Sequence, residues 1–255
     1  METQVRWTDA QRYERGFWER LARKIETGVR GQLDWYDWKA RELERRVFRW
    51  MGEGDRAKAK VLEIGSGPIG IVSFLDWGER FAIDPLEDFY KNRGSLVALR
   101  NPSVKFLKGV GEDLPFNDGV FSLAIVDNVI DHTQSPRRIL DEVHRVLKPG
   151  GLLYLAVNVH TRWGAIVHEV LAMARIDCGH PHTFTARCIR EVLLSSRFQI
   201  CADESESYEE AKRKDCEAES LRARLKGYVG VSEFEYRSVC EKVVGTVRTF
   251  HRLEC

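Results

Sequence analysis

The feature that most constrains this chain is an apolar run that ends in a glycine turn, residues 61–70, VLEIGSGPIG. Glycine tolerates positive φ and carries no Cβ, so Gly65 and Gly67 let the chain turn tightly and let a ligand approach the backbone. Gly70 allows close packing of the segment that follows. The pattern predicts a buried strand, a tight turn and the start of a helix. By itself the turn does not identify a ligand, and a turn that binds nothing stays open.

Short apolar runs recur after this one and are separated by helical patterns or polar turns. Continuous apolar strands that alternate with helices indicate an α/β protein with a parallel sheet covered on both faces. Pro136–Leu147 has the apolar spacing of an amphipathic helix, and Lys148-Pro-Gly-Gly151 would end it. The predicted strands are Lys60–Ile64, Arg80–Ile83, Val104–Leu107, Phe121–Val126 and Leu152–Val157.

The first 58 residues differ in character, because they are rich in charge and aromatics and hold five of the seven tryptophans. Their apolar spacing predicts two or three amphipathic helices. We expect residues 1–58 to form a helical cap that folds over a cleft as a lid. In the alternative, the aromatics simply pack the helices onto the sheet, as large aromatics at helical spacing usually do.

Residues 59–255 are expected to form the main domain, with a charged insertion near 203–240. Helices are predicted at Trp163–Ala174 and Thr185–Ser195, a strand at Phe198–Ala202, and a solvated helix within Asp203–Lys226. Val243–Leu253 is predicted as the last strand.

Overall charge and apolar content limit the classes of partner. The net charge is +1, so no global field draws the chain to nucleic acid or to an anionic membrane. No apolar run is long enough to span a bilayer, and the polar N-terminus does not have the pattern of a secretory signal. We therefore expect a cytoplasmic protein with no nucleic-acid and no membrane partner, and leave a homodimer open. The six cysteines all follow residue 177 without a Cys-x-x-Cys pair and are expected to be reduced thiols.

Two residues near the turn favour a cationic ligand over a dinucleotide. Pro68 removes a backbone N–H donor that a pyrophosphate would need. Glu63 places a negative side chain just before the turn, which suits a ligand such as S-adenosylmethionine, with its sulfonium and ammonium groups. Asp84 stands at the end of the next strand, where a carboxylate can hold a ribose diol.

A set of motifs in order across residues 60–157 resembles the class I S-adenosylmethionine-dependent methyltransferases. Residues 61–70 resemble their first motif and Ala82-Ile-Asp-Pro85 the second. Residues 111–116, GEDLPF, and Phe121–Asp127 are similar to the third and fourth, and residues 142–151, EVHRVLKPGG, close the set. The resemblance implies a doubly wound, mostly parallel seven-stranded sheet of Rossmann-like type.

The resemblance also implies a role for individual residues toward S-adenosylmethionine, whose product is S-adenosylhomocysteine. Residues around the glycine turn would line the methionine part: Glu63, Gly65, Ser66 and Gly67. Asp84 and Pro85, after the second strand, would hold the ribose, and Asp127 and Asn128, after the fourth, would lie beside the sulfonium. Glu112, Asp113 and Leu114, after the third strand, would surround the adenine, with Asp113 accepting from its amino group and the Leu114 amide donating to a ring nitrogen.

Histidines cluster where a methyl acceptor would bind. An alcohol needs its proton removed, and an imidazole titrates near neutrality. His132 follows the fourth strand, with Asp131 beside it, and His180 and His182 lie in a Gly-His-Pro-His-Thr-Phe-Thr element similar to a loop of some sugar or small-metabolite methyltransferases. These four residues are the catalytic candidates; the alternative is that the histidines only hold the turn or cap the next helix.

His144 and His168 fall within predicted helices, where a solvated position is expected. The spacing Cys178-x-His180-x-His182 does not match structural zinc sites, so no metal is predicted.

The predicted function is methylation of a small molecule, with a sugar or secondary-metabolite hydroxyl as acceptor and a histidine as general base. No Asn-Pro-Pro-Tyr-like motif follows the fourth strand, and no Pro-Cys pair supplies a nucleophile for cytosine chemistry. Alternatives are N-methylation of a small amine, and a non-catalytic S-adenosylmethionine-binding partner or sensor.

Overall fold

The computed structural model describes residues 2–28, 35–173 and 181–244. Seven strands form one sheet in the order β3-β2-β1-β4-β5-β7-β6, and β7 alone runs antiparallel to its neighbours. The predicted α/β, mostly parallel, seven-stranded sheet is therefore confirmed. The strands are β1 Lys60–Ile64, β2 Glu79–Asp84, β3 Val104–Lys108, β4 Phe121–Asp127, β5 Leu147–Val159, β6 Phe198–Ser205 and β7 Phe234–Lys242.

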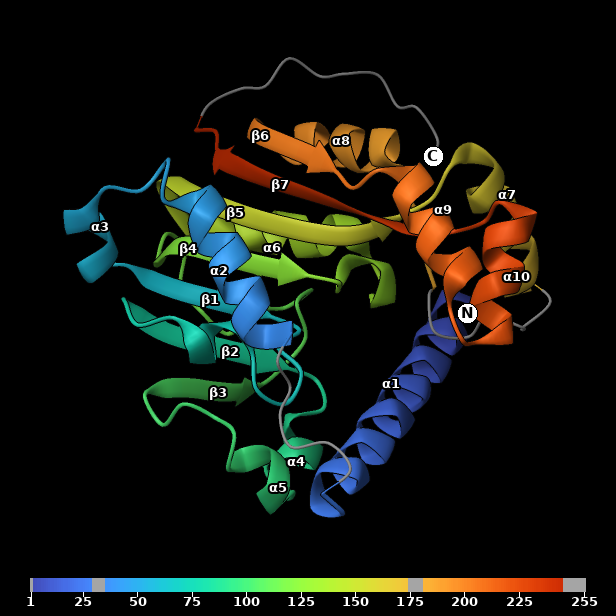
Figure 1. Cartoon of the computed structure of the whole chain (residues 1–255). Helices are drawn as coiled ribbons and strands as arrows, with labels where there is room; N and C mark the ends of the chain where they lie inside the picture. Colours follow the sequence, from blue (N-terminus) through green and yellow to red (C-terminus); the bar gives the residue numbers. More distant parts are fainter. Residues whose placement is uncertain (1, 29–34, 174–180, 245–255) are drawn as a thin grey trace.

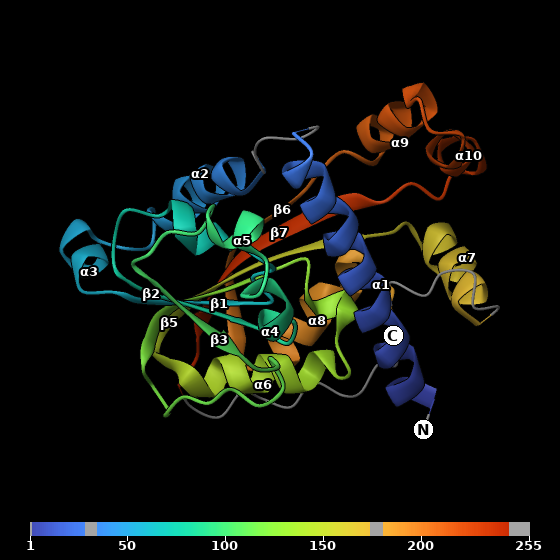
Figure 2. The same ribbon diagram turned by 90° about the horizontal axis from the view of Figure 1, so that it is seen from below.

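Helices cover both faces of the sheet (Figure 1), and Figure 2 shows the two layers on either side of the strands. One face carries α1 Glu2–Glu26, α2 Trp35–Val47, α4 Glu87–Tyr90 and α5 Gly94–Val97, and the other carries α6 Pro136–Val146 and α8 Ala186–Ser195. The short α3, Glu53–Ala57, precedes β1. Three further helices lie beyond the carboxyl ends of the parallel strands: α7 Arg162–Met173, α9 Tyr208–Glu217 and α10 Leu221–Val229.

Helix α6 forms for reasons visible in its sequence. Ser135 caps it by accepting the Arg138 N–H at 3.4 Å, and Pro136 occupies the first helical position, where no N–H is needed. Its apolar stripe, including Leu140 and Val143, is fully buried against the sheet. The following Lys-Pro-Gly-Gly segment ends the helix but already belongs to β5.

The helix expected directly after the glycine turn is reduced to a single 3₁₀ turn, Ile71–Phe74. Gly70 has φ of +79°, and Leu75 returns to an extended conformation, so the chain cannot continue as an α-helix. Helix α2 packs against this turn instead. A segment from the N-terminal region thus completes the layer over β1.

The N-terminal helices share one hydrophobic core with the sheet. Trp18 from α1 and Tyr36 and Leu43 from α2 are buried in the same cluster as Val61 and Ile125 of the strands. These three side chains pack the helices onto the sheet, as the packing alternative expects.

The C-terminal third departs from the sequence expectation in two places. The last strand of the described residues is Phe234–Lys242, which pairs with both β5 and β6 and was not predicted; from residue 245 onward the predicted strand Val243–Leu253 lies outside the described residues. The charged stretch contains the end of β6, two helices and most of β7. Cys188 is disulfide-bonded, so reduced thiols were the wrong expectation for it; sequence spacing cannot show a pairing that depends on tertiary proximity.

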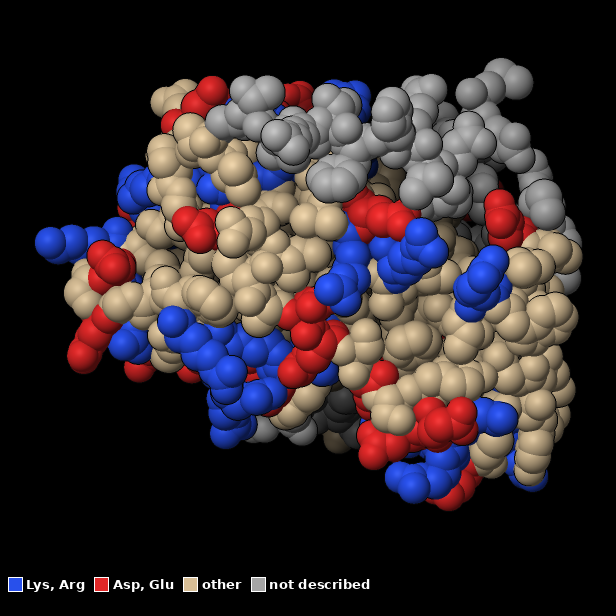
Figure 3. All heavy atoms as spheres, turned by 90° about the horizontal axis from the view of Figure 1, so that it is seen from above, with Lys and Arg blue, Asp and Glu red and all other residues tan. Residues whose placement is uncertain are grey.

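The surface agrees with a near-neutral chain. On the face shown in Figure 3, basic and acidic side chains are interspersed among apolar and neutral ones. None of the helices in the described ranges combines the length and the apolar character that crossing a bilayer requires.

Candidate functional site

A pocket of about 570 Å³, open to solvent, lies at the carboxyl ends of β1, β2 and β4. This is the edge of an open α/β sheet where ligands bind. Six predicted site residues line it: Gly65, Asp84, Pro85, Glu112, Asn128 and His132. The remaining walls come from α1, from the ends of β1 and β2, from the loop after β3, from the segment after β4 and from α6: Trp7, Gln11, Glu14, Ile64, Leu86, Gly109, Val110, Gly111, Val129, Thr133 and Ile139.

Asp84 ends β2 and connects two loops of the pocket. Its Oδ2 accepts the Gly67 N–H at 2.9 Å and its Oδ1 accepts the Leu86 N–H at 2.8 Å. Burial raises the pKa of this carboxyl to about 7, against the effect of the two N–H donors. Each oxygen keeps a further lone pair, so the carboxylate can also accept hydrogen bonds from two neighbouring hydroxyls.

Glu63 lies behind the glycine turn and outside the pocket lining. Its two oxygens accept the N–H groups of Ile71 and Val72, each at 3.0 Å. Burial raises its pKa to about 8. The carboxylate thus fixes the backbone of the 3₁₀ turn, and its position differs from the cofactor-lining place that the resemblance implied.

Aromatic side chains from the N-terminal helices cover the other side of the turn. Tyr36 Oη donates to the Ser66 carbonyl at 3.2 Å. A Cβ at Gly67, which has φ of +60°, would lie 2.7 Å from that Oη and 3.0 Å from Trp18 Cζ2. Ser66 and Gly67 are therefore packed under α1 and α2, and neither lines the pocket.

The chain after β4 turns sharply into the pocket. Asn128 has φ of +52°, and its N–H donates to the Ala156 carbonyl at 2.8 Å. Its Oδ1 is buried and accepts no hydrogen bond from the described residues. A strained backbone and an unsatisfied buried acceptor in a pocket wall are typical of a ligand contact.

Of the three residues predicted around adenine, one lines the pocket and two lie outside its lining. Glu112 lines the pocket, and its Oε1 accepts the Gln134 and Ser135 N–H groups at 2.8 and 3.3 Å. Asp113 is exposed and outside the pocket lining. Leu114 is buried, and its amide donates to Glu142 Oε2 at 2.8 Å. The amide expected to reach the adenine ring thus has a protein partner.

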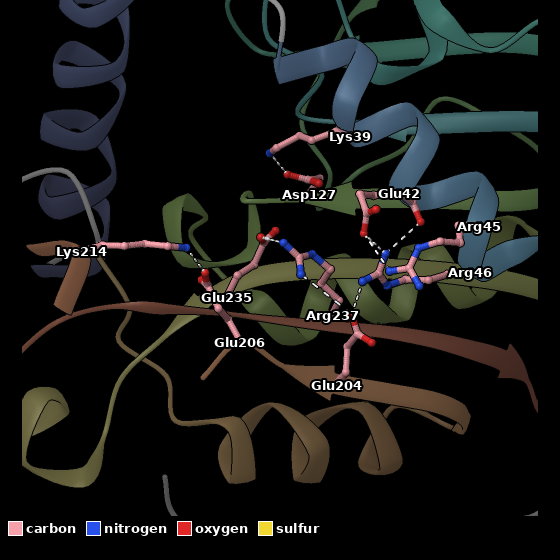
Figure 4. Close-up of polar contacts among 10 residues, drawn as sticks. All are labelled: Lys39, Glu42, Arg45, Arg46, Asp127, Glu204, Glu206, Lys214, Glu235 and Arg237. Atoms are coloured by element: carbon pink, nitrogen blue, oxygen red, sulfur yellow. Dashed lines mark hydrogen bonds and ion pairs between the residues drawn. The ribbon is translucent and has the colours of Figure 1, made fainter. Parts of the chain in front are cut away.

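Asp127, at the end of β4, forms an ion pair with Lys39 of α2 and is absent from the pocket lining. The two side chains are 4% and 19% exposed. Figure 4 shows this pair beside a separate network of charges that joins α2 to the strands β6 and β7. Arg237 pairs there with Glu235, whose pKa is raised by burial, while Arg46 joins Glu42 to Glu204.

The catalytic candidates lie in the turn after β4 and the segment that packs on it. His132 lines the pocket, and its Nε2 is 3.5 Å from Oδ2 of the buried Asp131. His182 lies against the same turn. Its backbone N–H donates to the Asp131 carbonyl at 3.2 Å, and its imidazole Nε2 lies 3.0 Å from the Thr133 carbonyl oxygen. Because a carbonyl only accepts, this Nε2 carries the proton. His180 falls outside the described residues.

Three pocket residues on α1 were missed from the sequence. Trp7, Gln11 and Glu14 follow the i, i+4, i+7 spacing of one helix face, which is the signal that could have identified them. Glu14 also accepts the Trp18 indole N–H at 2.8 Å. With Asp84 and Glu112 it gives the pocket three carboxyl groups, a negative field that suits a cationic ligand.

Comparison with known proteins adds a family match. Residues 62–155 match the model of a family described as a methyltransferase domain. A thiol S-methyltransferase of Homo sapiens, TMT1B, is 32% identical over 116 residues, which are 44% of this chain and 48% of the relative. An uncharacterized methyltransferase of Mycobacteroides abscessus is 33% identical over 103 residues, 39% of each chain. The matched segments span less than half the length of these relatives.

Solved structures share the fold at low identity. A geranyl diphosphate C-methyltransferase from Streptomyces coelicolor, solved with Mg²⁺, geranyl diphosphate and S-adenosylhomocysteine, has a TM-score of 0.60 at 12% identity and covers 80% of this chain and 78% of its own. The [4+2]-cyclase SpnF has a TM-score of 0.58 at 18% identity, covering 82% and 81%. At these identities the likeness shows the fold alone.

Proposed function

We propose that this chain, whose residues 62–155 match a methyltransferase-domain family, uses S-adenosylmethionine as a class I methyltransferase and methylates a hydroxyl group of a small molecule. One observation carries the proposal: an imidazole, His132, lines the same pocket as Gly65, Asp84 and Asn128. The pocket thus combines groups suited to a cationic nucleoside with a group suited to removing a proton.

The chemistry of the pocket fits S-adenosylmethionine. Carboxyl groups of Glu14, Asp84 and Glu112 favour its sulfonium and ammonium charges. Asp84 retains lone pairs for the ribose hydroxyls, and the Asn128 Oδ1 offers a buried acceptor. When bound, the cofactor supplies an electrophilic methyl carbon, and its sulfur takes the electron pair of the breaking C–S bond.

His132 is proposed as the general base. As the acceptor oxygen bonds to the methyl carbon, its proton passes to the His132 imidazole. Asp131, 3.5 Å from Nε2, stabilises the imidazolium that forms. His182 is assigned a supporting role, because its Nε2–H is already donated to the Thr133 carbonyl and holds the turn that carries His132. Beyond acid–base chemistry, the protein orients the two reactants.

The first test uses isotope-labelled cofactor with a panel of sugars, phenols and other alcohols, with amines and thiols as additional arms. The thiol arm is included because the human relative is named a thiol S-methyltransferase. Label transferred to a hydroxyl oxygen supports the proposal. Label found only in the amines would mean that the enzyme is an N-methyltransferase instead. Cofactor binding by calorimetry without transfer to any acceptor would favour a non-catalytic binder, and absence of binding would reject the cofactor.

The second test is His132→Gln. Loss of a general base should lower kcat about 10²- to 10⁴-fold, while calorimetric affinity for S-adenosylmethionine stays within a few-fold of wild type. His144→Gln is the matched control, because this imidazole lies in α6 and bonds the Val243 carbonyl, away from the pocket. Undiminished kcat in His132→Gln would exclude His132 as the base.

A further inference from the structure

Two histidines and a glutamate converge outside the cofactor pocket, where the sequence predicted no metal. His160 follows β5, His168 lies in α7, and Glu233 directly precedes β7. One ligand atom from each lies within 4.8 Å of the others. The two imidazole rings have centroids 4.2 Å apart, and His168 Nε2 is 3.8 Å from Glu233 Oε1. Segments remote in sequence thus bring three metal-ligating groups together.

The solvated positions expected for His144 and His168 were both wrong, since the two side chains are buried. His160 and His168 are only 8% and 6% exposed, and α7 lies beyond the carboxyl ends of the strands, close to α10 (Figure 1). The Trp163 indole N–H donates to the Val229 carbonyl at 3.2 Å and joins the start of α7 to the end of α10. The backbone N–H of His160 donates to the Phe184 carbonyl at 2.8 Å. The ligand-bearing segments are therefore held by contacts that do not involve the imidazoles.

From this arrangement we propose that His160, His168 and Glu233 form a binding site for a divalent transition metal of the Zn²⁺ or Co²⁺ type. Two imidazoles and one carboxylate favour such ions over Mg²⁺ or Ca²⁺, which prefer oxygen ligands. Three protein ligands leave at least one coordination position open, as in catalytic zinc sites. At metal–ligand distances near 2.0–2.2 Å, tetrahedral ligand atoms lie about 3.4 Å apart, so the widest separation must shorten on binding.

The glutamate of the cluster is open to a second cleft and has an internal competitor. Glu233 and Lys226 both line this cleft, which lies between Tyr13 of α1 and helix α10. Lys226 Nζ lies 2.5 Å from Glu233 Oε1, so its ammonium occupies one of the carboxylate oxygens. An arriving cation competes with Lys226 for this carboxylate. Removing the lysine charge should therefore strengthen metal binding, an effect opposite to loss of a ligand.

The test titrates the chelator-treated full-length chain with Co²⁺ followed by visible absorption, and with Zn²⁺ by calorimetry. We expect one equivalent to bind, with Co²⁺ bands of a nitrogen-ligated, low-coordinate site. Zn²⁺ at a hundredfold excess over Kd should raise Tm by roughly 5–10 °C. Neither measurement depends on methyl transfer. The metal proposal can therefore be rejected while the proposed methyltransferase function stands, and the function can be rejected while the metal proposal stands.

Variants decide whether these side chains bind the ion. His168→Gln and Glu233→Gln should each weaken binding at least tenfold, whereas Lys226→Met should tighten it several-fold; the last variant keeps all three ligands and guards against misfolding. His144→Gln, which removes a buried imidazole elsewhere, should leave the affinity unchanged. Absence of binding, equal affinity in wild type and the two ligand variants, or weaker binding in Lys226→Met would each overturn the proposal.

Discussion

The carboxyl edge of the sheet has two sides that are built in different ways. The cofactor side, around Gly65, Asp84 and Glu63, consists of turns whose backbone N–H groups are held by buried carboxylates from the adjoining strands. The other side, around Asp127, Glu235 and Glu233, consists of ion pairs, of which Lys39–Asp127 joins residues 88 apart in the chain. Turn geometry therefore shapes the first side, whereas the second depends on where α2 and α10 pack.

The largest effect should come from the pair between Lys39 and Asp127. Lys39→Met leaves the carboxylate of Asp127 buried without its partner, which should lower the free energy of unfolding by about 3–5 kcal/mol. The double variant Lys39→Met/Asp127→Asn removes both charges and should recover much of this loss. Urea unfolding of the two single variants and the double variant measures the coupling. If Lys39→Met lowers the free energy of unfolding by less than about 1 kcal/mol, the pair contributes no more than a solvent-exposed ion pair. The contrast between the two sides would then be weaker.

On the cofactor side, Gly65→Ala should have the next largest effect. Gly65 has φ of +66°, and an added Cβ would lie 2.4 Å from Val129 Cγ2. Left-handed strain and overpacking together cost about 2–3 kcal/mol. Displacement of the turn should lower affinity for S-adenosylmethionine roughly 30- to 150-fold by calorimetry. Gly94→Ala is the control, since its Cβ meets nothing within 4 Å. Equal affinities in the two variants would contradict the role given to the turn.

The buried carboxyls of the cofactor side predict a pH dependence of the cofactor-free protein. Burial raises the pKa of Asp84 to about 7 and that of Glu63 to about 8. The folded state therefore binds more protons than the unfolded state between about pH 4 and 8, so stability falls as pH rises through this range. We expect Tm to fall by at least roughly 5 °C from pH 5 to pH 8, which corresponds to about 2 kcal/mol.

Glu63→Gln isolates this contribution. The variant loses one acceptor for the two N–H groups and should be less stable at pH 5, but its Tm should vary less with pH than that of the wild type. An identical slope in both proteins would mean that other groups govern the pH dependence.

The smallest effect is expected from Tyr36→Phe, which probes how firmly α2 holds the turn. The variant keeps the buried ring and removes the hydrogen bond to the Ser66 carbonyl. Such a bond contributes about 1 kcal/mol, so cofactor affinity should fall several-fold at most. Tyr13→Phe, at an exposed position of α1, is the control and should change nothing. A loss as large as that of Gly65→Ala would mean that α2, not glycine geometry, determines the turn.

Much of the sheet could be predicted because each strand is a local pattern. β1 matches its predicted range, and the next strands differ by a few residues, most at the start of β5. Asp84, Asn128 and His132 were found because each follows a predicted strand at the ligand-binding edge. The strand β7 was missed because its sequence mixes charged, polar and apolar residues; four of its nine residues are buried where it pairs with β5 and β6.

Side-chain partners were the harder part to predict. Glu63 accepts backbone N–H groups 8 and 9 residues away, and Glu142 accepts the Leu114 N–H, 28 residues away; no local pattern indicates these partners. Asp127 was expected beside the sulfonium, yet Lys39, 88 residues away, forms its ion pair. Such pairings depend on which helix lies over which strand.

Local patterns in the chain were enough to predict the α/β sheet, the glycine turn at its centre and the edge at which the pocket opens. They were enough because glycine conformation and apolar periodicity act over a few residues. Only the tertiary structure decided which carboxylates face the pocket, that α1 closes it with Trp7, Gln11 and Glu14, and that His160, His168 and Glu233 meet. The reason is that burial and charge pairing depend on distances in space between segments that the chain order leaves far apart.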